Sequence, residues 1–282
     1  MTTSQPLADT LPHLESKSLW VRQQVLKMAT AAGCGHIASS FSCTEILVAL
    51  YYGGFFRFRA DSRDWPQRDR FVLSKAQAAL ALYPVLADCG FFPASELITF
   101  CSNGSRLGGH AENGTPGVDV FSGSLGHGLG LACGIAYGGK LDRAGYRVYV
   151  LLGDGECQEG SVWESALFAG HHQLANLVAI VDCNRLSASE RIENYLGLEP
   201  FADKWRSFGF DTLVIDGHSL PALLNAYSEA AAQRSRPLAI LARTVKGKGV
   251  PFMEDRAEWH YRTPDVRELA EACRILEVPS EK

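Results

Sequence analysis

Apolar positions along the chain follow two different periods. Short apolar runs rich in branched residues are typical of strands buried on both faces, whereas apolar residues that recur every three or four positions are typical of helices. The pattern predicts strands at 70–74, 210–215 and 237–245, in the run YRVYVLL before Gly153 and in the run LVAIVDC before Asn184. It predicts helices at 14–32, 43–53, 77–89, 201–209, 219–234 and 264–277, and another that begins near Gln158. Because strands and helices alternate, we expect an α/β fold, a parallel sheet flanked by helices on both faces.

Two stretches lie outside this alternation. Residues 1–13 are expected to form a loose N-terminal tail. Residues 35–40, Gly-His-Ile-Ala-Ser-Ser, are mostly small and are expected to form a loop. No internal repeat, low-complexity segment or linker divides the rest, so residues 14–282 are expected to form a single domain.

The most informative stretch is a strand-helix-strand unit. Gly153-Asp154-Gly155-Glu156 follows its first strand and Asn184 follows its second. Because parallel strands joined by a crossover helix end at the same edge of the sheet, Asp154 and Asn184 should lie side by side there.

This pair of side chains predicts a cation site. Magnesium prefers oxygen ligands and usually fills several positions with phosphates and water. Asp154, Asn184 and a backbone carbonyl just past it, which we place at Leu186, would supply three protein oxygens. Gly153 and Gly155 would let the backbone approach the phosphates. A bare GDG is more often a simple turn, but the strand, helix, strand and asparagine at this spacing favour a cation-diphosphate site.

The same stretch carries a resemblance. The pattern resembles the diphosphate-binding motif of thiamine diphosphate enzymes, and the string GDGECQEGSVWESALFAGHHQLANLVAIVDCN is similar to transketolases. The resemblance implies the thiamine diphosphate-binding fold, specifically its diphosphate-binding module, over residues 14–282. It also implies thiamine diphosphate and Mg²⁺ as cofactors, with Ca²⁺ or Mn²⁺ able to substitute, and Gly153 to Glu156 and Asn184 as cofactor-binding residues.

Two histidines lie in small-residue contexts. His36 follows Gly35, and composition alone equally allows a loop histidine that caps the next helix. His110 lies in the stretch Gly-Gly-His-Ala-Glu. The resemblance implies that both are catalytic, close to the reactive carbon of the cofactor and the substrate oxygens, and that Gly123 and Leu125 lie along the cofactor.

Several further positions match or depart from the family pattern. Gln77, in Ser-Lys-Ala-Gln, stands where the family has a histidine that contacts the diphosphate, and we interpret it as an altered phosphate contact. His127 stands where the family commonly has glutamine. Lys75 is either an anion contact or a solvated lysine. The resemblance places Lys246, in Lys-Gly-Lys-Gly, close to the cofactor, and it matches Trp259-His260 without assigning them a role.

The resemblance covers only the first third or so of a whole transketolase. The resemblance therefore implies that the module that binds the aminopyrimidine ring and supplies the activating glutamate belongs to another chain. We therefore expect the N-terminal subunit of a split transketolase, which would pair with a separate C-terminal subunit in an α₂β₂ complex to transfer a two-carbon ketol unit from a ketose (phosphate) donor to an aldose acceptor. Glu159 and Glu164 stand where family members have interface carboxylates, although exposed helical glutamates are nearly as good an interpretation.

Composition excludes other classes. The chain has 282 residues, is 46% hydrophobic and carries a formal net charge of −4, so no basic excess points to nucleic acid. It has no apolar run of membrane-spanning length and no signal-peptide pattern in residues 1–12, and we expect a cytoplasmic protein. The eight cysteines form no CxxC pair, so that neither a disulfide framework nor a zinc site is expected.

Two other functions stay open. The α subunit of a 2-oxo acid dehydrogenase shares the cofactor and the motif in which GDG after one strand is followed by an asparagine after the next. A degenerate assembly subunit would explain Gln77 and His127, but the presence of Asp154, Asn184 and both histidines argues against it. The sequence does not identify the sugar substrates.

Overall fold

Within the residues that the structure describes, five parallel strands form one sheet. The structure, a computed structural model, describes residues 7–62, 64–112, 114–194 and 196–278. The strands are β1 (Arg70–Leu73), β2 (Val148–Gly153), β3 (Leu177–Cys183), β4 (Asp211–Asp216) and β5 (Leu238–Arg243). Their order in the sheet is β1-β2-β3-β5-β4, and every neighbouring pair is parallel. The predicted α/β class is therefore confirmed.

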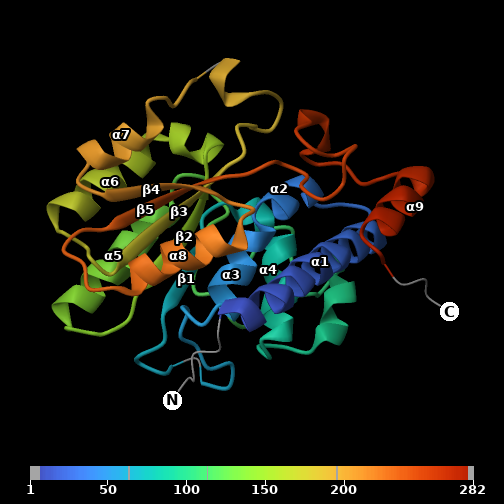
Figure 1. Cartoon of the computed structure of the whole chain (residues 1–282). Helices are drawn as coiled ribbons and strands as arrows, with labels where there is room; N and C mark the ends of the chain where they lie inside the picture. The colour runs from blue at the N-terminus through green and yellow to red at the C-terminus, as the bar shows by residue number, and fades with distance from the viewer. Residues whose placement is uncertain (1–6, 63, 113, 195, 279–282) are drawn as a thin grey trace.

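Helices cover both faces of this sheet. In chain order they are α1 (Leu7–Ala32), α2 (Ile37–Ser42), α3 (Thr44–Tyr52), α4 (Ala79–Asp88), α5 (Gly128–Leu141), α6 (Gly160–His171), α7 (Phe201–Ser207), α8 (Leu220–Ala231) and α9 (Val266–Ile275). Figure 1 shows α5, α6 and α7 on one side of the sheet and α1, α3 and α4 on the other. In the described part of the chain, none of them combines the length and apolar character needed to cross a membrane.

The side chains of β2 divide between two apolar cores. Tyr149 and Leu151 join the core that contains α1, α3, α4 and α8. Val148, Val150 and Leu152 join the core that contains α5, α6 and α7. Successive side chains of a strand point to opposite faces, so a sheet covered on both sides needs continuous apolar strands. This is why the strands are visible in the sequence as unbroken apolar runs.

The helical boundaries differ from the expectation in two places. Helix α1 begins at Leu7, so residues 7–13 are not a loose tail, and residues 1–6 lie outside the described range. Pro12 lies inside this helix and Leu11 packs against the core. The expected loop at 35–40 is also wrong, because Ile37–Ser42 form α2, in which all six residues are buried. A fully buried helix of small residues has no polar face, and therefore no helical period in its sequence.

Candidate active site

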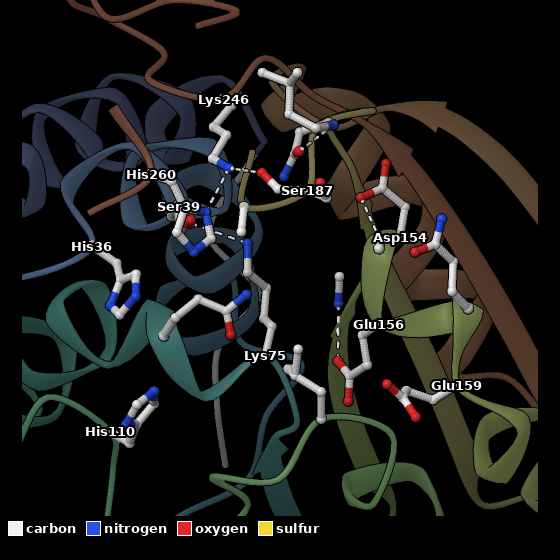
Figure 2. Close-up of a pocket in the computed structure, with 18 of the residues that line it drawn as sticks. His36, Ser39, Lys75, His110, Asp154, Glu156, Glu159, Ser187, Lys246 and His260 are labelled. Carbon is white, nitrogen blue, oxygen red and sulfur yellow. Dashed lines mark hydrogen bonds between the residues drawn. The ribbon is translucent and has the colours of Figure 1, made fainter. Parts of the chain in front are cut away.

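A cavity of about 410 Å³ lies at the carboxyl edge of the sheet. All the candidate site residues line it: His36, Gln77, His110, Gly123, Leu125, Gly153, Asp154, Gly155, Glu156, Asn184, Leu186 and Lys246. Figure 2 shows His36, His110 and His260 at one end of this cavity, and Asp154 at the other. The structure thus brings together residues from separate stretches of the chain. The chemical role of each residue remains a prediction.

Asp154 and Asn184 lie at adjacent strand ends, as the crossover rule requires. Gly153 pairs in register with Asp182 across β2 and β3. The carboxylate of Asp154 accepts hydrogen bonds from the backbone N–H of Gly155 at 2.9 Å and of Arg185 at 2.6 Å. The Asp154 side chain therefore bridges the segments that follow the two strands.

The donor set of this corner fits a hard divalent cation. Asp154 is buried, and burial followed by the nearby Asp182 carboxylate raises its pKa to about 7. No ion pair neutralises Asp154 within the described residues. A bound cation would stabilise the charged form of such a buried, unpaired carboxylate. The described residues contain no metal cluster of three or more His, Cys, Asp or Glu, so a cation here would depend on the Asn184 amide oxygen, a backbone carbonyl and ligand oxygens.

Lys75 forms a buried ion pair with Asp182. Its ammonium group also donates to the carbonyl of Ser39 at 3.1 Å, and the hydroxyl of Ser42 donates to Asp182 at 2.6 Å. Burial lowers the pKa of Lys75, but the Asp182 charge outweighs it and the net pKa is raised. The solvated-lysine alternative is therefore wrong. Asp182 was missed, although an acidic residue in the otherwise apolar run LVAIVDC signals a buried partner.

Glu156 lines the cavity, but its carboxylate is engaged by the protein. It accepts hydrogen bonds from the hydroxyl of Ser74, from Gly126 N at 2.9 Å and from Gly153 N at 3.2 Å. These donors belong to the loop after β1, the glycine-rich loop before α5 and the end of β2. Glu156 thus ties three walls of the cavity together.

Among the described residues, the hydrogen-bond acceptors of Lys246 are all neutral. Its ammonium group donates to the carbonyl of Ser187 at 2.7 Å and to Nδ1 of His260 at 2.9 Å (Figure 2). Burial, followed by the nearby Lys75 charge, lowers the pKa of Lys246 to about 8. Burial, followed by Lys246, also lowers the pKa of His260 to about 4. His260 is therefore neutral near pH 7 and can accept this hydrogen bond; the Trp259-His260 match was its only signal in the sequence.

His36 is the centre of an aromatic cluster. Its ring centroid lies 5.9 Å from that of His110, 5.2 Å from that of His260 and 4.6 Å from that of Tyr261. Burial, followed by the His260 and His110 charges, lowers the pKa of His36 to about 3. Its buried Nδ1 has no hydrogen-bond partner among the described residues. An unsatisfied buried imidazole nitrogen is costly unless a ligand pairs with it.

Gln77 and His127, the two residues that differ from the transketolase pattern, lie in different places. Gln77 lines the cavity just before α4. His127 does not line it: the side chain is exposed and its Nδ1 lies 3.1 Å from the carbonyl oxygen of Leu125. The His127 departure therefore lies outside the cavity wall. Glu159 and Glu164 are both exposed, and of the two only Glu159 is among the residues that line the cavity.

Comparisons with known proteins agree with this geometry. The chain is 44% identical to a transketolase of Mus musculus over 257 residues, which cover 91% of this chain and 40% of that protein. It is 38% identical over 269 residues to an apulose-4-phosphate transketolase subunit of Phocaeicola vulgatus, with 95% of each chain covered. The crystal structure of the Campylobacter jejuni transketolase superposes with a TM-score of 0.88 at 27% identity, over 94% of this chain and 42% of that one.

These matches show the family and how much of each relative the chain covers. The chain spans about 40% of the length of the whole transketolases it matches, somewhat more than the expected third, and almost all of the Phocaeicola subunit. The structural match confirms the thiamine diphosphate-binding fold. The family described as "Transketolase, thiamine diphosphate binding domain" matches residues 18–276, and the chain therefore belongs to that family.

Proposed function

We propose that this chain is the diphosphate-binding subunit of a two-chain transketolase. The observation that carries the proposal is its equal coverage with the Phocaeicola subunit, 95% of each chain, against 40% of a whole transketolase. The matched region would supply the diphosphate-binding module, and we infer that a second subunit carries the pyrimidine-binding module and the activating glutamate. We infer an α₂β₂ complex that transfers a two-carbon ketol unit from a ketose phosphate to an aldose. The cytoplasm remains our prediction for its location.

The charges of the cavity support binding of a metal and a polyanion together. In the described part of the chain, no cation forms an ion pair with the buried Asp154 carboxylate, and no carboxylate forms one with the buried Lys246 ammonium group. A divalent ion and a diphosphate would satisfy both. We assign Asp154, Asn184 and the Leu186 carbonyl to Mg²⁺, and Lys246 and Gln77 to the diphosphate.

The glycine-rich walls would complete the cofactor site. Gly153 and Gly155 would allow close approach of the phosphates, while Gly123 and Leu125 would lie along the cofactor. Glu156 would act by fixing these walls rather than by touching the ligand. Thiamine diphosphate, when bound, supplies the nucleophilic carbon for ketol transfer, and the protein supplies orientation and electrostatics.

The end of the cavity that is lined by the histidines would bind the substrate. His36 and His110 would donate hydrogen bonds to, or exchange protons with, the sugar oxygens. The lowered pKa of His36 keeps its imidazole neutral, with one donor and one acceptor nitrogen. His260 would hold Lys246 in place at the border between the two ends.

The decisive experiment is purification of the tagged chain from its native cells with thiamine diphosphate and Mg²⁺ present. We expect a stoichiometric second protein, and ketol transfer in the mixture but not in the chain alone. Donors to assay are apulose 4-phosphate, which the name of the Phocaeicola subunit contains, and xylulose 5-phosphate, which is bound in a solved transketolase structure. Decarboxylation of a 2-oxo acid would favour the dehydrogenase alternative, and a lone chain without cofactor binding would favour the degenerate subunit.

The metal assignment has its own test. Asp154→Ala should abolish Mg²⁺-dependent thiamine diphosphate binding in the complex, measured by isothermal titration. Asp203→Ala, at an exposed position of α7, is the matched carboxylate control and should bind normally. Unchanged binding in Asp154→Ala would overturn the site assignment.

A further inference from the structure

The backbone that carries Lys246 is held from behind by a buried polar network. The network contains Arg22 of α1, Glu45 of α3 and His218 of the loop between β4 and α8. We propose that Glu45 and His218 are positioning residues for Lys246, which they hold in place through the backbone of Val245. The inference rests on the proposed role of Lys246 as a diphosphate contact.

The network is bonded to both ends of the Lys246 segment. The backbone N–H of Val245 donates to Nε2 of His218 at 2.8 Å. The guanidinium Nε of Arg22 donates to the carbonyl of Lys248 at 2.8 Å. The residue before Lys246 and the second residue after it are therefore fixed by side chains distant in sequence.

The hydrogen bonds define the protonation of His218. Because Nε2 accepts from a backbone N–H, the ring proton must lie on Nδ1. Nδ1 lies 2.9 Å from Oε2 of Glu45 and donates to it. Glu45 in turn accepts two hydrogen bonds from Arg22, at 2.6 and 2.8 Å. Glu45 thus fixes the tautomer and the orientation of the ring, as a carboxylate does for a histidine in many sites.

The backbone around Lys246 is also fixed by its own conformation and by a hydrogen bond to α2. Gly247 has a φ of +82°, and a Cβ there would lie 2.3 Å from the backbone oxygen of Met253. Its N–H donates to the carbonyl of Ala38 at 3.0 Å, which ties the segment to α2. With the backbone fixed on these sides, the Lys246 side chain extends into the cavity toward Ser187 and His260 (Figure 2).

The network does not line the cofactor cavity. Arg22, Glu45 and His218 line a second cavity of about 400 Å³. Arg22 and Glu45 are buried and could serve stability alone. An ion pair between Arg22 and Glu45 that only stabilised the fold would not require the hydrogen bond from Val245 to His218. An effect of His218 on cofactor affinity should therefore depend on Lys246.

Three substitutions of His218 separate its two hydrogen bonds. Glutamine places an amide near the position of Nε2 and can still accept from Val245, whereas asparagine is too short to reach it, and phenylalanine keeps the ring without either bond. In the complex that co-purifies with the chain, we expect His218→Phe and His218→Asn to weaken thiamine diphosphate binding by about three- to tenfold. His218→Gln should restore most of the affinity. Hydrogen exchange of the Val245 amide should accelerate in the two weakened variants only.

A double-mutant cycle tests the route through Lys246. In a Lys246→Met background, His218→Phe should cause no further loss of affinity. Tyr227→Phe is the structural control: it removes the buried 2.9 Å hydrogen bond from Tyr227 to the carbonyl of Ile46, next to Glu45, and should leave affinity unchanged.

The outcomes that overturn the two ideas differ. Equal losses from His218→Phe in both backgrounds, or unchanged exchange of the Val245 amide, would overturn the positioning role. Unchanged cofactor affinity in Lys246→Met alone would overturn the diphosphate role of Lys246, whatever the amide exchange shows.

Discussion

Lys75 and Lys246 are buried lysines that face the same cavity, yet their partners differ. Each is 1% exposed, and each follows a strand of the sheet. Lys75 forms an ion pair with Asp182, whereas Lys246 donates to a backbone carbonyl and a neutral histidine. Correspondingly, the pKa of Lys75 is raised and that of Lys246 is lowered to about 8.

The difference distinguishes Lys75, whose charge stabilises the fold, from Lys246, whose charge is available to a ligand. A buried ion pair whose partners are both present carries no net charge into the cavity. A buried cation without an anion costs free energy in the unliganded protein. Perturbed groups of the second kind cluster at functional sites. The two lysines should therefore respond in opposite ways when each is removed.

The largest effect is expected from Lys75→Met. It leaves Asp182 buried without its cation, which should lower the free energy of unfolding by about 3–5 kcal/mol. Urea unfolding of the purified chain measures this. The double variant Lys75→Met/Asp182→Asn should recover part of the loss, because no charge is then stranded. A loss below about 1 kcal/mol would contradict the ion pair.

The second prediction concerns alkaline pH. The folded pKa of Lys246, about 8, lies below the ordinary lysine value of 10.5, so the unfolded chain binds more protons between these values. The free energy of unfolding should therefore gain up to about 3 kcal/mol from Lys246 as the pH rises through this window. Lys75, with a raised pKa, contributes stability that is present in this window and is lost as the pH rises through its folded pKa.

The measurement is the difference between the wild-type chain and Lys246→Met in urea unfolding at several pH values. Subtraction removes the titration of the other groups. The wild type should be the less stable of the two near pH 7 and should approach the variant as the pH rises toward the ordinary lysine pKa of 10.5. A difference that does not change with pH would contradict the unpaired state of Lys246.

The third prediction concerns the cofactor. Lys246→Met should weaken thiamine diphosphate binding by about tenfold to a hundredfold, the equivalent of about 1.5–3 kcal/mol for a hydrogen bond to a charged group. Lys246→Arg keeps the charge and tests whether charge alone is sufficient. Titration of the purified complex at constant Mg²⁺ measures both variants, and Lys248→Met, on the partly exposed neighbour, is the matched control.

The two lysines also show which features of the fold and the site could be predicted from the sequence. The strands and the Asp154–Asn184 edge follow from apolar runs and the crossover rule, because both depend on neighbours along the chain. The partner of Lys75 is on β3, two strands away across the sheet, and the approach of His260 to Lys246 depends on a loop after β5. These contacts arise from tertiary packing, which local periodicity does not encode. Helix α2 was missed for a related reason, since its burial removes the amphipathic signal.

The smallest effect is expected from Ser42, one of several residues that donate hydrogen bonds to Asp182. Ser42 donates a 2.6 Å hydrogen bond to this carboxylate, whereas the hydroxyl of Ser40, in the same helix, has no hydrogen-bond partner in the described structure. Ser42→Ala should lower the free energy of unfolding by about 1–2 kcal/mol, because it removes a hydrogen bond to a buried charge. Ser40→Ala should leave it nearly unchanged. Equal losses from the two variants in urea unfolding would mean that α2 responds to its packing and not to the hydrogen bond with Asp182.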